Sequence, residues 1–308
     1  MTLRALVAAL GGDLYAGGMR ANVPAPGHSR SDRSVSLLLA GDRVLIHGFG
    51  AVEWREVRDH LRAQGLLDSA GRLIGAGGSV RDAGPPSPDR AVRVATARQL
   101  WDEAGKIGPA SLSARYLSGR AIGREPELVA ALRHHPAVPL RVYQPGRALR
   151  PALLAAIQGA DGRLTAVELT YLTSAGRRDD RLRVSRKTVG LVPPGSAVRL
   201  AAPAATLVVG EGVMTVLSAS EIFARPGWAL LSARNLAGWT PPPGVARVLI
   251  AADRGAPGEA AAARQAARLR GFGLEARIRL PPGDADDWNA WAMERRKEGK
   301  GRAPMRPG

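Results

Sequence analysis

Acidic side chains follow three separate apolar segments in the last third of the 308-residue chain. Glu211 follows ATLVVG, Asp253 follows VARVLIAA, and a third group lies in LPPGDADDWN, where the acids are Asp284, Asp286 and Asp287. Ligands of an open parallel sheet bind beyond the carboxyl ends of its strands, so we expect these acids to share one rim. Carboxylates there suit Mg²⁺ or Mn²⁺, which would neutralise phosphate charge and orient an attacking oxygen. The alternative for any one acid is a helix N-cap or a turn.

The elements that must position these acids alternate between strand and helix patterns. Apolar runs at residues 205–209, 229–231, 245–251 and 275–280 predict strands, and residues 212–223 and 258–271 predict helices. Such alternation with short connections favours a parallel sheet flanked by helices. The predicted fold class is therefore α/β in this part of the chain.

Composition limits the chemistry further. Cysteine is absent, which excludes disulfides, thiolate metal sites and a cysteine nucleophile. Lys and Arg total 44 against 27 Asp and Glu, a net charge of +17 that attracts polyanions such as nucleic acid. The alternative explanation of this charge is a high-GC genome, which enriches arginine.

The chain contains no run of 18 apolar residues, so no membrane span is predicted. Its apolar start favours an amphipathic helix over a signal peptide, so we expect a cytoplasmic protein.

The acidic motifs resemble those of the Toprim family. VVGEGVMTVLSA is similar to its first motif (strand, Glu-Gly, helix), AADRGAPGEAAA to its second (Asp-x-Asp-x-x-Gly-x-x-Ala-Ala), and LPPGDADDWN to the Asp-Trp-Asn segment of primase-type members. The resemblance covers residues 203–292. It implies that Glu211 is a general acid/base or metal ligand, Asp253 a metal ligand and Asp287 a candidate second one. The chain departs from the pattern at Gly255, where the second Asp is expected; Asp286 or Asp287 would compensate, or activity would be reduced or absent.

The N-terminal part resembles a primase zinc-binding domain that has lost its cysteines. Ala25-Pro26-Gly27-His28, SVSLLL and Gly48-Phe49-Gly50-Ala51 are similar to Cys-Pro-x-His, a strand and Cys-Phe-x-Cys. Zinc needs about four ligands and only His28 remains, so we predict a ribbon-like β unit without zinc. The alternative is a plain hairpin with a surface histidine. Strands are expected at 34–39 and 43–47 around Gly41-Asp42, between a helix that ends near Gly11-Gly12 and another at 51–64.

The middle region carries a basic cluster. ARYLSGRAI at 114–122 resembles the start of primase polymerase cores, and residues 151–178 resemble the segment before Toprim in phage and mobile-element primase-like proteins. Helices are predicted at 95–103, 111–118 and 151–158, and a strand at 165–173 after the turn at Asp161-Gly162. The predicted contacts to nucleic-acid or nucleotide phosphates are Arg177, Arg186, Lys187 and Arg254; a solvated loop is the alternative.

Together these patterns predict a Toprim domain, a Rossmann-like parallel sheet flanked by helices, behind a primase-core-like α+β region and a small β unit. The expected divisions are a degenerate zinc ribbon at 1–68, a linker at 69–93, the core-like region at 94–202, Toprim at 203–292 and a basic disordered tail at 293–308. The resemblance implies a DNA primase-like protein that binds single-stranded DNA and nucleoside triphosphates, uses Mg²⁺ or Mn²⁺ and no zinc, and makes short primers. A metal-dependent nuclease and a non-catalytic DNA-binding replication accessory protein stay open. No Walker A pattern occurs, so a replicative helicase would be a separate partner.

Overall fold

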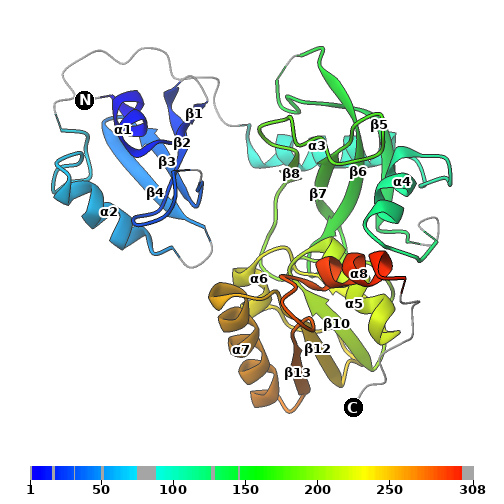
Figure 1. Ribbon diagram of the computed structural model, residues 1–308. Helices are drawn as coiled ribbons and strands as arrows, with labels where there is room; N and C mark the ends of the chain where they lie inside the picture. The colour runs from blue at the N-terminus through cyan, green and yellow to red at the C-terminus, as the bar shows by residue number, and fades with distance from the viewer. Residues whose placement is uncertain are drawn as a thin grey trace. The chain divides into compact units, whose positions relative to one another are not determined.

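The computed structural model describes residues 2–15, 18–30, 32–49, 52–74, 88–125, 129–144 and 146–299 (Figure 1). The chain divides into two compact units, Met1–Ser87 and Pro88–Gly308, which are described separately below. Within the described residues, no helix is both long and apolar enough to cross a membrane.

The first unit is a four-stranded antiparallel sheet with two helices packed on its core. Its elements are α1 (Leu3–Leu10), β1 (Asp13–Tyr15), β2 (Arg20–Val23), β3 (Val35–Ala40), β4 (Arg43–Gly48) and α2 (Trp54–Ala63). The predicted hairpin is present, and Gly41 at its turn has a φ of 63°, which glycine adopts readily. The first helix ends as predicted, with Gly11 in the left-handed conformation.

The loop that contains Ala25-Pro26-Gly27-His28 is held by a carboxylate. Asp32 accepts hydrogen bonds from the backbone N–H groups of Ala25 (2.9 Å) and Ser34 (3.1 Å), and its Oδ2 lies 3.1 Å from the His28 Nδ1. Gly50 and Ala51, at the other end of the resemblance, lie outside the described residues.

The expected linker at 69–93 also needs correction. Arg72 bridges to Arg43 within the first unit, and α3 already begins at Arg90.

The second unit begins with an antiparallel sheet that has helices on both faces. Its strands are β5 (Leu132–Pro139), β6 (Leu149–Gln158), β7 (Leu164–Tyr171) and β8 (Arg186–Gly190), in that order. Helix α3 (Arg90–Glu103) packs on one face through Leu100, and α4 (Leu112–Gly119) packs on the other through Leu117.

The predicted helix over residues 151–158 is wrong, because this segment is strand β6. Leu154 packs toward α3, whereas Leu153 and Ile157 face α4 and the helix α5 (Val213–Phe223). A strand buried on both faces reads as a continuous apolar run, which periodicity cannot distinguish from a buried helix. The turn at Asp161-Gly162 therefore joins two strands, β6 and β7.

The second sheet has the order β13-β12-β10-β11-β9, and all of its pairs are parallel except β11 with β9. Its strands are β9 (Val198–Arg199), β10 (Thr206–Gly210), β11 (Gly227–Ala229), β12 (Arg247–Ala251) and β13 (Glu275–Arg279). The remaining helices are α6 (Ala233–Gly238), α7 (Ala256–Gly271) and α8 (Trp288–Lys297). The predicted α/β fold class is confirmed.

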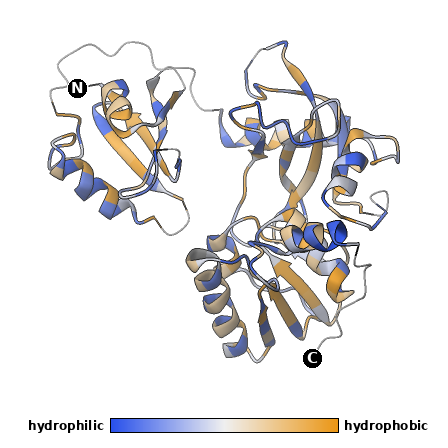
Figure 2. Cartoon of the chain, viewed as in Figure 1, coloured by the Kyte–Doolittle hydropathy of each residue, from blue (hydrophilic) through white to orange (hydrophobic). Residues whose placement is uncertain are grey.

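Alternate residues of these strands bury opposite faces of the sheet. Val208 and Leu249 pack with α5 and with Trp288 of α8, whereas Val209 and Ile250 pack with α6 and α7. The central strands β10 and β12 are accordingly mostly hydrophobic, whereas the edge strand β13 alternates with charged residues and the helices carry hydrophilic residues on their outer sides (Figure 2). Helix α8 continues to Lys297, so the predicted disordered tail cannot begin at residue 293. Residues 300–308 lie outside the described part.

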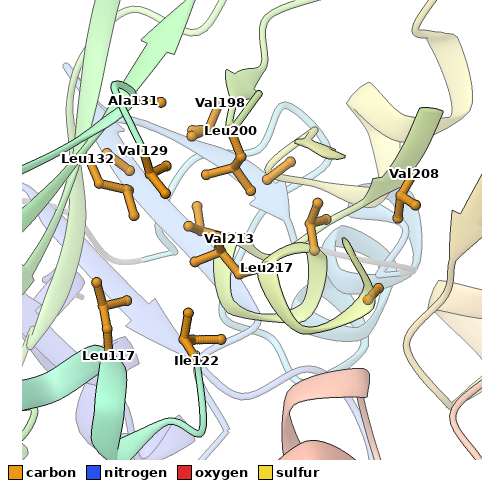
Figure 3. Close-up of a cluster of buried hydrophobic side chains, with 14 of the residues drawn as sticks. Leu117, Ile122, Val129, Ala131, Leu132, Val198, Leu200, Val208, Val213 and Leu217 are labelled. Atoms are coloured by element: carbon orange, nitrogen blue, oxygen red, sulfur yellow. The ribbon is translucent and has the colours of Figure 1, made fainter. Parts of the chain in front are cut away.

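One hydrophobic core joins the two sheets of the second unit. Leu117 and Ile122, from α4 and the loop after it, lie in one cluster with Val213 and Leu217 of α5 (Figure 3). Polar contacts reinforce this junction, since the Glu221 carboxylate accepts hydrogen bonds from the backbone N–H groups of residues 123 and 124. The antiparallel sheet and the parallel sheet are therefore parts of one folded body.

Candidate functional site

Glu211 and Asp253 emerge at the same edge of the parallel sheet. Strands β10 and β12 are direct neighbours with Val209 opposite Ile250, and each acid follows the carboxyl end of its strand. The strands approach closely because residue 210 is glycine; a Cβ there would lie 2.7 Å from the Ala251 carbonyl oxygen.

Asp253 is the most perturbed acid at this edge. Burial, together with the charges of Asp287 and Glu211, raises the pKa of Asp253 from 3.8 to about 6, and a hydrogen bond with the Thr215 side chain opposes the rise. Its Oδ1 is buried, and no atom of the described residues makes a hydrogen bond to it. A buried carboxylate oxygen without a partner is costly for the folded protein, and such atoms are typical of sites that receive a ligand or ion.

Glu211 is held by its surroundings rather than by a charged partner. Burial raises the pKa of Glu211, and a hydrogen bond from the Ala233 backbone N–H at the start of α6 lowers it. The Glu211 carbonyl accepts a hydrogen bond of 2.9 Å from the Leu231 N–H. Leu231 has a φ of +72°, which is unfavourable for a bulky side chain, so the local structure must stabilise this conformation next to the site.

The third acidic segment brings one carboxylate to the site. Asp287 is close enough for its charge to raise the pKa of Asp253, whereas Asp284 and Asp286 are exposed. Asp287 also caps α8, since its Oδ1 accepts a hydrogen bond of 2.7 Å from the Ala290 N–H. The two roles considered for this acid, a helix cap and a member of the acidic rim, are therefore compatible in the same side chain.

The two glycines of the second motif have different structural roles. Gly255, in the place of the expected second Asp, has a φ of +111° and a ψ of 151°, a region that only glycine adopts without strain. At Gly258 a Cβ would lie 2.8 Å from the Asp253 carbonyl oxygen, so glycine is needed for the turn that carries Asp253. The backbone at position 255 thus disfavours any side chain, including a carboxylate.

Two of the four predicted phosphate contacts are engaged with the protein itself. The Arg254 guanidinium donates hydrogen bonds to the carbonyl oxygens of residues 281, 283 and 285. The Lys187 ammonium donates to the Leu140 carbonyl (2.7 Å) and lies 5.1 Å from the centre of the Tyr171 ring. Burial lowers the pKa of Lys187 to about 8. Phosphate binding by these two residues stays a prediction that the observed contacts do not favour.

The other two predicted contacts lie at or near a basic groove of about 860 Å³. Its lining includes Tyr116, Arg120, Arg177, Arg178, Arg181 and Met293. Arg178 and Arg181 are paired with Asp180 and Asp179, whereas no hydrogen bond or ion pair of the Arg177 guanidinium is present among the described residues. Burial raises the pKa of Tyr116, and the charges of Arg120, Arg178 and Arg186 lower it, which places Arg186 within electrostatic reach of the groove.

Helix α8 connects the groove with the acidic rim. Asp287 caps its first turn and Met293, six residues further on, lines the groove. At 1.5 Å per residue these positions are about 9 Å apart along the helix axis.

The residues at the rim fit a divalent cation that keeps several water ligands. Among the described residues, no group of three or more His, Asp or Glu side chains is arranged so that it could hold a metal ion. Mg²⁺, however, is commonly bound through one or two carboxylates together with water and substrate phosphates. The buried Oδ1 of Asp253 and the neighbouring carboxylates of Glu211 and Asp287 offer oxygen donors of that kind.

Several residues of this site were not predicted from the sequence. Thr215, buried in the first turn of α5, supplies the hydrogen bond to Asp253, and its place four residues after Glu211, at the start of the helix that follows this acid, is the signal that could have indicated it. Tyr116 and Arg120 line the groove although the basic cluster of 177–187 lies far from them in the sequence. Their convergence depends on the packing of α4, which local patterns do not specify.

Comparison with known families decides the nature of the C-terminal sheet. Residues 206–298 match the family described as "Toprim domain". This segment of the chain is a Toprim domain. The resemblance of the motifs is thereby confirmed, and the matched range extends through α8, beyond the predicted end at residue 292. Residues 91–200 match a family described as "Domain of unknown function (DUF7146)".

Similar solved structures include three primase structures. The primase fragment of the bacteriophage T7 primase-helicase protein is 15% identical with a TM-score of 0.41, and the match covers 60% of this chain and 70% of that one. The Aquifex aeolicus primase (zinc binding and RNA polymerase domains) is 13% identical with a TM-score of 0.46, covering 97% and 80%. A DNA primase domain from Pseudomonas aeruginosa is 17% identical with a TM-score of 0.42, covering 68% and 74%. Likeness at this level does not carry function, and no curated protein matches the chain.

Proposed function

We propose that this Toprim protein is primase-like and joins nucleotides into short primers on single-stranded DNA. The observation that carries the proposal is the buried, unpartnered Oδ1 of Asp253 beside the carboxylates of Glu211 and Asp287. Burial of like charges is unfavourable in the protein alone, so this arrangement is best explained by a cation that binds there with phosphate.

Asp253 and Asp287 would hold a Mg²⁺ or Mn²⁺ ion, with Glu211 as the base. When bound, the ion supplies positive charge that offsets the charge of the reacting phosphates. Glu211 has a raised pKa, so its carboxylate is suited to accept the proton of the primer 3′ hydroxyl. The new bond joins the 3′ oxygen to the α-phosphorus, the α–β phosphate bond breaks, and pyrophosphate leaves.

The groove along α8 would hold the nucleic acid. Arg177 and Arg186 provide cations for phosphates, and Tyr116 gives an aromatic surface at the same place. Because the groove and the rim share α8, template or nucleotide phosphates bound in one would lead toward the other.

The direct test is primer synthesis on single-stranded DNA with nucleoside triphosphates and Mg²⁺ or Mn²⁺. We expect the wild type to make short products and the variants Glu211→Gln and Asp253→Asn to lose at least about 100-fold in rate, as is typical when a base or charge-stabilising group is removed. Products that form equally in both variants would refute the assigned site. Cleavage of DNA without nucleotides would assign the same acids to a nuclease.

A non-catalytic DNA-binding role is the second candidate, and Gly255 favours it. The family's second motif expects a carboxylate at that position, and the backbone there disfavours any side chain. In that case the protein would bind DNA with steep salt dependence. Neither synthesis nor cleavage would be detected with either metal.

A further inference from the structure

Arg254, the residue after Asp253, binds the loop that carries the third acid. Its backbone N–H donates to the Asp286 carbonyl at 2.7 Å. Its Nη2 donates to the carbonyls of Pro281 (2.7 Å) and Gly283 (2.6 Å), and its Nε donates to the Ala285 carbonyl (3.2 Å). Three of these four bonds come from the guanidinium, whose donors lie in a rigid planar fork. Together with the backbone bond they determine the path of the loop from 281 to 286.

The far end of this loop is fixed as well. Asp287 caps α8 through the Ala290 N–H, and the buried Trp288 donates from Nε1 to the Arg279 carbonyl at 3.1 Å. Asp287 therefore stands between two anchors, one made by Arg254 and one made by α8. In neither anchor does a cation pair with the Asp287 carboxylate.

Position 255 cannot easily supply this charge. Gly255 has a φ of +111°, and its backbone N–H donates to the Glu259 carboxylate at 3.0 Å. An Asp at 255 would have to keep this glycine conformation or disturb the start of α7.

We infer that Arg254 is a positioning residue, which docks the loop 281–287 so that Asp287 stands at the rim with Asp253. The inference rests on the proposed metal site and adds how this chain holds the loop that carries one of its acids. Arg254 then supports the loop structurally, whereas the sequence had suggested that it contacts nucleic-acid phosphates.

The test compares the full chain with Arg254→Ala, Arg254→Lys and Asp287→Asn. Arg264→Ala, an exposed arginine on α7, is the matched control. Hydrogen exchange of residues 281–290 in metal-free protein measures how well the loop is held. Titration with Mn²⁺ followed by electron paramagnetic resonance measures the affinity of the site without any need for catalysis.

We expect faster exchange of the loop and about 10–100-fold weaker Mn²⁺ binding in Arg254→Ala, the range seen when supporting residues of metal sites are removed. Arg254→Lys should recover only part of both, since a single ammonium cannot span three carbonyls. Asp287→Asn should keep the loop and helix α8 intact, because Asn is as good a cap as Asp, yet weaken Mn²⁺ binding. The control should match the wild type in both measurements.

Failure of this inference is distinguishable from failure of the proposed function. If wild type binds Mn²⁺ and Arg254→Ala binds it equally well, the positioning role is refuted and the metal site stands. If Asp287→Asn binds Mn²⁺ as well as wild type, Asp287 is not a ligand, and both the inference and this part of the proposed site are refuted. If wild type binds no Mn²⁺ while Arg254→Ala loosens the loop, the docking contact stands, and both the proposed metal site and the role of Asp287 in it are refuted.

Discussion

Asp253→Asn should stabilise the metal-free protein while it removes the candidate site. The pKa of Asp253 is raised from 3.8 to about 6 by burial and by the charges of Asp287 and Glu211. Each pKa unit is worth about 1.4 kcal/mol, so ionisation of Asp253 costs the folded state about 3 kcal/mol at neutral pH. This figure is an upper limit, because Asp253 is partly exposed and water screens its charge.

The sign of the pH dependence follows from proton binding. Between pH 4 and 6 the folded protein keeps a proton on Asp253 that the unfolded chain has lost, so the free energy of unfolding falls as the pH rises through this window. Asn carries no charge at any pH. The variant should therefore match the wild type near pH 4 and exceed it by up to about 3 kcal/mol above pH 7, which corresponds to several degrees in Tm for a unit of this size.

Thermal unfolding in a chelator at pH 4 and pH 8 measures both values. Asp286→Asn, an exposed acid of the neighbouring loop, is the matched control and should change Tm little at either pH. Addition of Mg²⁺ should then raise the Tm of the wild type but not that of Asp253→Asn, because only a folded state that binds the ion is stabilised by it. A variant that is no more stable than wild type at pH 8, or equally more stable at both pH values, would show that Asp253 is not a strained carboxylate.

Three further outcomes are expected. Gly255→Ala should destabilise the protein by about 1–3 kcal/mol, because Gly255 has a positive φ. Gly271→Ala should not, because its φ is not positive and a Cβ meets open space at both positions. Chemical denaturation measures the difference in the free energy of unfolding. Gly258→Ala should displace the Asp253 turn and weaken Mn²⁺ binding in a metal titration, because its Cβ would lie 2.8 Å from the Asp253 carbonyl, and unchanged affinity would contradict this packing. In binding to single-stranded DNA, Arg177→Ala should lower the slope of log affinity against log salt by about 1, and Lys187→Met should leave it unchanged, since the Lys187 ammonium is engaged with the Leu140 carbonyl.

The sequence by itself determined the parallel sheet and two of its acids. Glu211 and Asp253 each follow a strongly apolar segment of strand length, and the strand–helix alternation around them has few other solutions. The absence of cysteine likewise restricted any metal site to oxygen and imidazole ligands. These features depend on residues that are close together in the chain, which is why local patterns were sufficient for them.

Only the tertiary structure decided the partners of the charged side chains and the identity of β6. Arg254 binds the carbonyl of Pro281, and Tyr116 lines the same groove as Arg177 and Arg178. No local pattern specifies such pairs. The apolar run at 151–158 became a strand because α3 covers one of its faces and α4 with α5 the other. Burial on both faces, and hydrogen bonds to backbone carbonyls that every residue possesses, leave no signature in the sequence of side chains.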